Sequence, residues 1–215
     1  MAPPPDRNHR PNLSEIAYDE IKEMILSGEL PQGERIILDA MAERLNLSIT
    51  PVREALNKLA QEDLIRMTPR TSYKVIQFDK KDISDIYDLR ELLETYALKS
   101  SGGDLTRFPA AHFRELCMKS MEKGDYKEFI QIDIAFHKEI ISLSQNIKLP
   151  KMFDSIYNAI RILSIPSAQI KGRVVKSQAE HIDIIDAIDT NEVEHAASAL
   201  SFHIKRTKHL FLQSF

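Results

Sequence analysis

Hydrophobic residues repeat at three- and four-residue intervals over most of this chain of 215 residues. That interval is typical of the buried face of a helix. One stretch differs: Leu64–Met67 and Tyr73–Phe78 are rich in strand-forming residues and flank the turn-forming run Thr68–Ser72. We therefore predict a mainly α protein with a small β-hairpin in the first half of the chain.

Three helices are predicted before the hairpin. Residues 1–12, which hold four of the ten prolines, are expected to form a disordered arm. The second and third helices are joined by a short turn at Asn46, and Ser48 is a suitable cap for the third. Their predicted inward positions are Leu38, Met41, Ala42 and Leu45, then Val52, Leu56 and Leu59.

The third predicted helix carries a different set of residues on its other face. Thr50, Arg53 and Asn57 lie there, where they can meet a ligand. A helix that presents such side chains from its first turns suits the major groove of DNA, with Arg reaching guanine or phosphate. The alternative is an ordinary helical hairpin with solvated polar residues. The hairpin that follows, with Arg70 at its tip, favours a winged helix-turn-helix.

Two motifs in this part of the chain resemble a known family. Gly33-Glu34-Arg35 and the run from Ser48 to Leu56, which contains Thr-Pro-Val-Arg-Glu-Ala-Leu, are similar to the DNA-binding head of GntR-type bacterial transcription regulators. The resemblance extends from Leu13 to about Phe78 and implies that Arg35 lies near the DNA backbone. Many members have Arg directly after the Ser, where this chain has Ile49, so the family's operator does not carry over. The candidate DNA-binding residues are Arg35, Ser48, Thr50, Arg53, Asn57 and Arg70.

The charge of the head does not by itself indicate a DNA-binding protein. The whole chain has a formal net charge of −3, and residues 1–78 hold 10 Lys/Arg against 12 Asp/Glu, a net −2. DNA-binding surfaces are usually basic. The basic residues must therefore gather on one face of the head, with the acids behind them. These residues are Arg35, Arg53, Lys58, Arg66, Arg70 and Lys74.

The cysteine content and the distribution of apolar residues indicate the cellular compartment in which the protein is expected. The single cysteine, Cys117, rules out an intramolecular disulfide and fits a reducing environment. No run approaches 18 apolar residues, so no membrane span is expected, and the first residues lack the apolar core of a signal peptide. We expect a cytoplasmic protein with no membrane partner.

From residue 79 onward the pattern is helical throughout. Glycine and proline fall between the predicted helices, and we expect Pro166 to follow the end of one helix and Asn191 to cap the last. The sequence therefore predicts a winged helix-turn-helix domain over residues 13–78 and an all-α bundle of about six helices over residues 79–215.

Three histidines and one aspartate are predicted to point into the core of this bundle. Asp133 and His137 share an inward face of one helix, while His181 and His203 lie on the inward faces of two others. Taken singly, each histidine is a candidate for a hydrogen-bonded core residue. Burying all four without strong partners is costly, and a divalent metal ion satisfies them together.

The same residues carry a second resemblance. Asp133-x-x-x-His137, Glu180-His181 and His203 are similar to the metal-binding FCD effector domain that follows the head in the FadR-type subfamily of GntR regulators. The resemblance implies a zinc-like ion and a small organic acid as effector. Three nitrogens and one oxygen suit zinc, and equally nickel, manganese or iron.

Two arginines are candidates for binding the effector. Arg90 faces the bundle, and the resemblance implies that it contacts the carboxylate of the acid; the alternative is an internal ion pair with Glu94. Arg161 is the second candidate.

The first functional hypothesis is a metabolite-responsive transcription regulator, a repressor that binds a two-fold symmetric operator as a homodimer and senses a small organic acid. The alternative is a metal-dependent hydrolase or lyase that uses Glu180 or Asp183 as a base, although no nucleophile motif supports it. A third option is a purely structural metal. The candidate residues for the dimer contact are Phe202, Leu210, Phe211 and Phe215.

Overall fold

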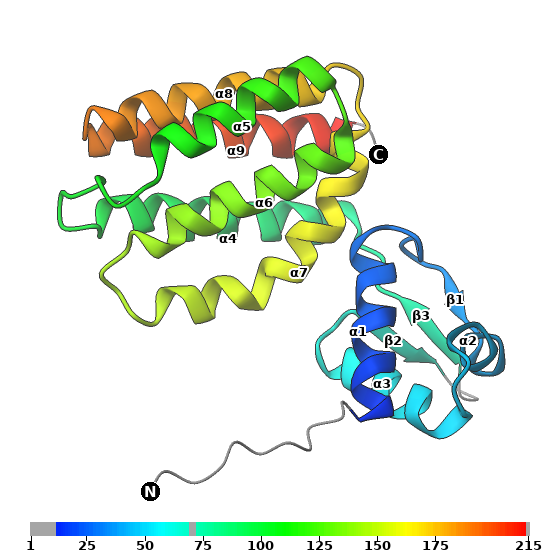
Figure 1. Cartoon of the computed structure of the whole chain (residues 1–215). Coiled ribbons are helices and arrows are strands. Elements are labelled where there is room, and N and C mark those ends of the chain that lie inside the picture. The colour runs from blue at the N-terminus through cyan, green and yellow to red at the C-terminus, as the bar shows by residue number, and fades with distance from the viewer. Residues whose placement is uncertain (1–11, 69–71, 214–215) are drawn as a thin grey trace, which may run out of the picture. The chain divides into compact units, whose positions relative to one another are not determined.

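The computed structural model describes residues 12–68 and 72–213 (Figure 1). The chain divides into two compact units, one ending at Gln77 and the other beginning at Phe78. The predicted fold class is confirmed: helices predominate, and a small sheet accompanies the first unit.

The head unit contains the three predicted helices, α1 (Leu13–Leu26), α2 (Leu38–Leu45) and α3 (Ile49–Gln61). α2 ends at Asn46, which has the left-handed backbone that the turn requires (φ 52°). Ser48 precedes α3 as predicted, but its side chain makes no capping hydrogen bond.

The core of the head confirms the predicted inward stripe of α3. Val52, Leu56 and Leu59 are fully buried. α1 packs along α3 and contributes its own apolar face, which consists of Ala17, Ile21, Ile25 and Leu26. Burial of this stripe leaves the opposite face of α3 at the surface.

The sheet of the head has one strand more than predicted. β2 (Ile65–Thr68) and β3 (Ser72–Val75) form the expected antiparallel hairpin. β1 (Arg35–Ile36) pairs with the other edge of β3 and gives the order β1-β3-β2. Two residues are too few to show a strand period, so the sequence pattern could not reveal β1.

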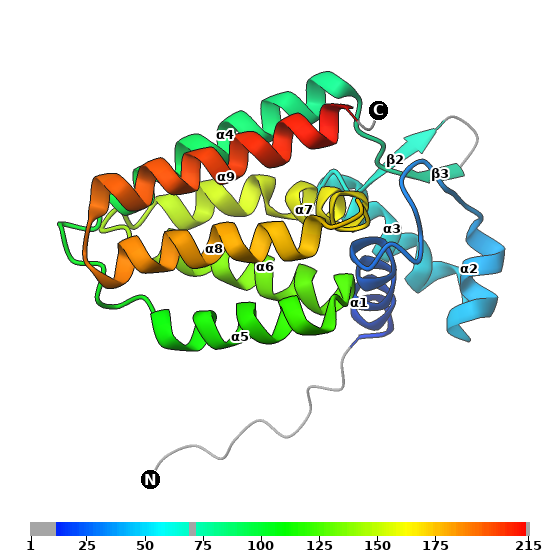
Figure 2. The same cartoon turned by 90° about the horizontal axis from the view of Figure 1, so that it is seen from above.

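Over residues 78–213, the second unit has six helices, in agreement with the prediction of about six. They are α4 (Lys80–Lys99), α5 (Ala110–Lys123), α6 (Tyr126–Ser142), α7 (Leu149–Ala168), α8 (Arg173–Asp189) and α9 (Val193–Gln213). Figure 2 shows α4 alongside α9 at one edge of this unit and α5 at the opposite edge, and α8 packs against both α5 and α9.

Two predicted helix boundaries are wrong. Pro166 lies inside α7 rather than after it. The helix continues because Ser167 and Ala168 beyond the proline are buried, and packing offsets the lost backbone hydrogen bond. Asn191 does not cap α9: it has a left-handed backbone (φ 58°), and its side chain binds the backbone of Gly103 and Leu105 instead.

The core of the helical unit surrounds Phe136 on α6. Its ring meets Phe108 and Phe113 edge-on and stacks on the imidazole of His181, with 4.4 Å between ring centres. The apolar core therefore reaches directly to the polar residues in the middle of the bundle. Within the described residues, none of the helices combines the length and apolarity that crossing a bilayer requires.

Candidate functional site

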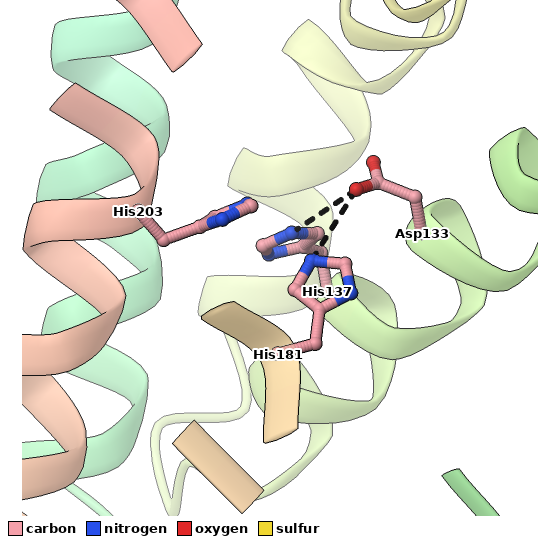
Figure 3. Close-up of side chains that lie close together, drawn as sticks. All are labelled: Asp133, His137, His181 and His203. Atoms are coloured by element: carbon pink, nitrogen blue, oxygen red, sulfur yellow. Dashed lines mark ion pairs between the residues drawn. The ribbon is translucent and has the colours of Figure 1, made fainter. Parts of the chain in front are cut away.

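The four predicted metal ligands lie together in the centre of the helical unit. Asp133 and His137 come from α6, His181 from α8 and His203 from α9 (Figure 3). Each offers one ligand atom, and these atoms lie within 4.8 Å of one another. All four side chains are buried. Asp133 Oδ1 is 3.4 Å from His181 Nε2 and 3.8 Å from His137 Nε2.

The donor atoms of this cluster fit a metal ion. His137 Nε2 and His181 Nε2 are buried and have no hydrogen-bond partner within the described part of the chain. A buried ring nitrogen without a partner is costly, and coordination to a divalent ion removes that cost. Three imidazoles and one carboxylate form a donor set that zinc and several first-row metals accept.

Each of the three histidines has a side-chain oxygen within hydrogen-bond distance of its Nδ1. His137 Nδ1 lies 2.5 Å from Glu94 Oε2, and His203 Nδ1 lies 2.7 Å from Glu180 Oε2. His181 Nδ1 lies 3.0 Å from the side-chain oxygen of Gln178. When Nδ1 donates to such an acceptor, Nε2 is left as the metal-binding atom. This arrangement therefore presents all three Nε2 atoms for coordination.

The electrostatics of the cluster keep Asp133 charged and His181 and His203 neutral. Burial raises the pKa of Asp133, but the nearby His181, His137 and Arg90 outweigh it and hold that pKa below its ordinary value. Burial lowers the pKa of His181 to about 4 and lowers the pKa of His203 as well. Metals bind the protonation states that result: a carboxylate and neutral imidazoles.

Arg90 makes the internal ion pair considered for it, and its contact with an effector stays a prediction. Its Nε donates to Glu94 Oε1 at 2.8 Å, which is the predicted internal ion pair. Its Nη2 has no hydrogen-bond partner among the described residues and lies 3.9 Å from Asp133 Oδ2. The guanidinium is thus anchored at one side and retains donors at the other.

A cavity of about 250 Å³, part of it open to solvent, lies against Asp133 and His203. Its lining residues are Tyr87, Arg90, Phe129, Asp133, Ser164, Ser167, Arg173, Ser177, His203 and Thr207. Arg90 was a predicted effector-binding residue. Arg161 is not one of the lining residues, and its role stays a prediction.

Sequence reasoning missed Arg173 and the hydroxyls of this cavity. Arg173 is buried; its Nη1 lies 3.2 Å from Glu180 Oε2, and its Nη2 donates to Thr207 Oγ1 at 2.5 Å. Its place after Gly172, at the first position of α8, gave no sign of burial because a helix start is normally exposed. Burial of a charged residue at that position can be recognised only when its ion pair with Glu180 is seen in the structure.

The head presents most of its candidate DNA-binding residues at the surface. Ser48, Thr50, Arg53 and Asn57 are exposed, and Asn57 Oδ1 accepts a hydrogen bond of 3.0 Å from the Tyr73 hydroxyl. This bond steadies Asn57 at the middle of α3. Arg70 lies outside the described residues.

Some of the basic residues of the head share one face of the sheet. Lys74 in the central strand is paired with Arg35 on one side and Arg66 on the other, and all three are exposed. Lys58 differs, because its ammonium lies 3.9 Å from the centre of the Tyr18 ring on α1. The row of three provides a local positive surface in a head that is not basic as a whole.

The comparisons with known proteins assign both units to families. The gntR family of bacterial regulatory proteins matches residues 13–75, and the FCD domain matches residues 85–206. Two of the matching proteins are regulators by name. The Nta operon transcriptional regulator of Aminobacter aminovorans is 32% identical over 185 residues, which is 85% of this chain and 87% of the relative. The gluconate operon repressor of Bacillus subtilis is 35% identical over 130 residues, 59% of this chain and 52% of the relative.

A solved structure shows the same fold. Escherichia coli McbR has a TM-score of 0.78 at 22% identity, covering 95% of this chain and 99% of that chain.

The fold and the family matches define a DNA-binding transcription regulator with a ligand-binding helical domain. The chain belongs to the GntR family of bacterial transcription regulators, and its second unit is an FCD domain, a metal-binding effector domain. Members of this family are regulators rather than enzymes, and the hydrolase or lyase alternative finds no support. Glu180, the suggested base, is already engaged by Arg173, Arg206 and His203, and Asp183 is exposed.

Proposed function

We propose that this protein is a metabolite-responsive repressor that a small organic acid releases from its operator. The acid binds in the cavity beside Asp133 and His203, where Arg90 receives its carboxylate. The observation that carries the proposal is the free Nη2 of Arg90, a buried guanidinium donor that lies beside the metal cluster and in the lining of the cavity. Such a donor gains most from an anionic ligand.

Zinc is the ion we propose for the cluster of Asp133, His137, His181 and His203, with nickel, manganese or iron as alternatives. When bound, the ion supplies a Lewis-acidic centre for an oxygen of the acid. Asp133 and the three histidines hold it, and Glu94, Glu180 and Gln178 orient those histidines. The cavity residues then position the remainder of the acid.

The proposed route from the cavity to the head runs through α4. This helix carries Arg90 and begins at Lys80, five residues after the end of β3 at Val75. An acid that pulls Arg90 shifts the start of α4 and so the orientation of the head. A coupling free energy of about 1–3 kcal/mol is enough to change operator occupancy.

Operator binding measured by fluorescence anisotropy tests this proposal, on protein prepared without chelator. A panel of organic acids is added to the complex, and at least one acid is expected to weaken DNA binding in metal-loaded protein and to do nothing after the metal is removed. Arg90→Lys keeps the charge but loses the forked donor geometry, and should weaken the response. If no acid in a broad panel affects either DNA binding or thermal stability, the sensing function is wrong.

For the head, we propose that α3 enters the major groove and that Thr50, Arg53 and Asn57 contact the bases, while Ser48, Arg35 and the wing residue Arg70 contact the backbone. The exposed face of α3 and the row formed by Arg35, Lys74 and Arg66 support this assignment. One head covers too few base pairs for useful specificity, so a homodimer on a two-fold operator is proposed as well.

The outer face of α4 is the surface we propose for the dimer contact. Leu89, Leu92 and Tyr96 recur there at helical spacing and are 45%, 63% and 45% exposed. Figure 2 shows α4 at the edge of the helical unit, beside α9. Apolar residues gathered in this way on an exposed helix face are typical of a protein–protein interface.

The occupant that we propose for this surface is a second copy of the chain. Asp85, near the start of α4 on the same face, is already paired with Lys81, so the apolar residues carry the contact. At the other end of the face, the Tyr96 hydroxyl bonds to Asn146. Two antiparallel copies of α4 crossing at Leu92 would place Leu89, Leu92 and Tyr96 of each against those of the other, as a two-fold contact requires.

This surface replaces the C-terminal residues as the candidate. Phe211 is buried and cannot serve, Leu210 is half-buried, and Phe215 lies outside the described residues; Phe202 alone is well exposed. Leu92→Asp should give a monomer in light scattering, while Met118→Asp, a similarly exposed residue on α5, should not. A dimer that survives Leu92→Asp and dissociates with Phe202→Asp would return the contact to the C-terminus.

A further inference from the structure

The lining of the cavity beside the metal cluster is unusually rich in hydroxyl groups. These groups narrow the class of acid that the cavity can bind. We infer that the effector is a short hydroxylated monocarboxylic acid, one carboxylate followed by a chain of hydroxyl-bearing carbons. This inference rests on the proposed sensing function and narrows its ligand class.

Hydroxyl groups form one wall of the cavity. They come from three helices: Ser164 and Ser167 from α7, Ser177 from α8 and Thr207 from α9. All four residues are buried. Serine and threonine hydroxyls both donate and accept, so they suit ligand hydroxyls, which do the same.

These hydroxyls are not all used within the protein. Ser164 Oγ donates to the carbonyl of Ile160, and Thr207 Oγ1 donates to the carbonyl of His203 and accepts from Arg173. Ser177 Oγ is buried with no hydrogen-bond partner anywhere in the described chain. A buried hydroxyl of this kind costs free energy that a polar ligand recovers. Ser177 is therefore the strongest single indicator of a hydroxyl-bearing ligand.

Apolar ligands fit the cavity poorly. Phe129 is the one residue of the lining without a polar side-chain atom. A fatty or aromatic acid would leave the hydroxyls, Arg90 and Arg173 facing hydrocarbon, which is costly. The space between the lining side chains is small, about 250 Å³ when its opening to solvent is included, and this limits the ligand to a short chain.

The charges around the cavity favour a single carboxylate. Among the lining arginines, Arg90 is paired with Glu94 and Arg173 with Glu180, so these charges cancel. Arg206 also reaches Glu180, but it is partly exposed to solvent and lies outside the lining. The two positive charges of the ion, less the one negative charge of Asp133, leave about one positive charge to be neutralised. One carboxylate achieves this, whereas a second would be buried with no cation of its own.

Isothermal titration of the zinc-loaded full chain tests the inference with acids matched in length. The hydroxylated acids are glycerate, threonate and gluconate; the deoxy acids are propionate, butyrate and hexanoate; the dicarboxylates are succinate and adipate. At least one hydroxylated acid should bind at least tenfold more tightly than its deoxy and dicarboxylate counterparts. Threitol and sorbitol, which lack the carboxylate, should not bind.

The variant Ser177→Ala isolates the hydroxyl contact. It should bind the preferred hydroxylated acid about three- to tenfold more weakly, with unchanged affinity for the deoxy acid. Ser120→Ala is the matched control, because Ser120 is also buried with an unpartnered hydroxyl but does not line the cavity. Its acid binding should match that of the wild type.

Three results would overturn the inference while leaving acid sensing intact: equal binding of deoxy and hydroxylated acids, tighter binding of a dicarboxylate, or no effect of Ser177→Ala. If none of the acids binds, the sensing function itself fails.

Discussion

The two units of this protein place their polar residues in opposite locations. Every buried residue of the head, among its described positions 12–68 and 72–77, is hydrophobic or a proline, and the candidate DNA-binding side chains lie at the surface. Within residues 78–213, the helical unit buries fifteen polar or charged residues, and the four candidate metal ligands are among them. The head is built as a rigid support for an exposed surface, whereas the helical unit is built around its site.

This difference predicts how stability and function are related in each unit. In the head, a functional side chain can be removed without disturbing the core, so stability and DNA binding should separate. In the helical unit, the site is buried against the core, and Phe136 of the core stacks directly on His181 of the site. Changes there should alter ligand binding, metal binding and stability together.

The largest effect is expected from Leu56→Asp in the core of the head. Leu56 is fully buried, and a carboxylate there loses the apolar packing and is left without a partner. The free energy of unfolding of the head should fall by more than about 4 kcal/mol. Circular dichroism melting measures it, with the exposed Glu54→Ala as control. A fully folded variant would show that the stripe is not the core.

The next largest effect is expected from His137→Ala in the metal cluster. It removes one proposed ligand and leaves Glu94 with Arg90 as its charge partner. Metal affinity should fall more than about a hundredfold, and the stabilisation by added zinc should disappear from thermal melts. Exposed His112→Ala on α5 is the control. Elemental analysis that finds about one ion per chain in the variant would contradict the assignment.

Arg53→Ala separates function from stability in the head. Its exposed side chain makes no contribution to the core, so melting should be unchanged within about 0.5 kcal/mol. Operator binding should weaken by about 1–3 kcal/mol per half-site. Arg114→Ala, at a half-buried arginine of the helical unit that pairs with Asp186, should leave operator affinity unaltered. Unchanged affinity of Arg53→Ala in a gel shift would exclude a base-reading role.

The smallest effect is expected from Glu180→Gln, which tests whether a buried polar residue of the helical unit can change metal affinity without changing the fold. The amide can still accept from His203 and Arg173, but it lacks the negative charge that makes His203 a better ligand. Metal affinity should fall about 10- to 100-fold with the fold preserved. Competition with a colorimetric chelator measures this affinity. An affinity equal to that of the wild type would mean that Glu180 serves only as the ion-pair partner of Arg173 and Arg206.

The sequence predicted most of the fold because its helices have strong periodicity and clear boundaries. It also predicted that Asp133, His137, His181 and His203 converge, since each lies on an inward face of a helix. It could not show β1, whose two residues depend on pairing with β3, nor the continuation of α7 through Pro166. The burial of Arg173 escaped prediction for the same reason: it depends on Glu180 and Thr207, contacts that a linear pattern does not contain.

The two faces of α4 have a consequence for measurements of ligand affinity and of self-association. Its inner face carries Arg90 and Glu94, and its outer face carries Leu89, Leu92 and Tyr96. If one rigid helix serves both the cavity and a two-fold contact, ligand affinity and self-association are reciprocal quantities. The apparent dissociation constant for the acid would then vary with protein concentration, and the dimer constant with the concentration of acid. In the cell, the number of copies of the regulator would set its sensitivity to the metabolite.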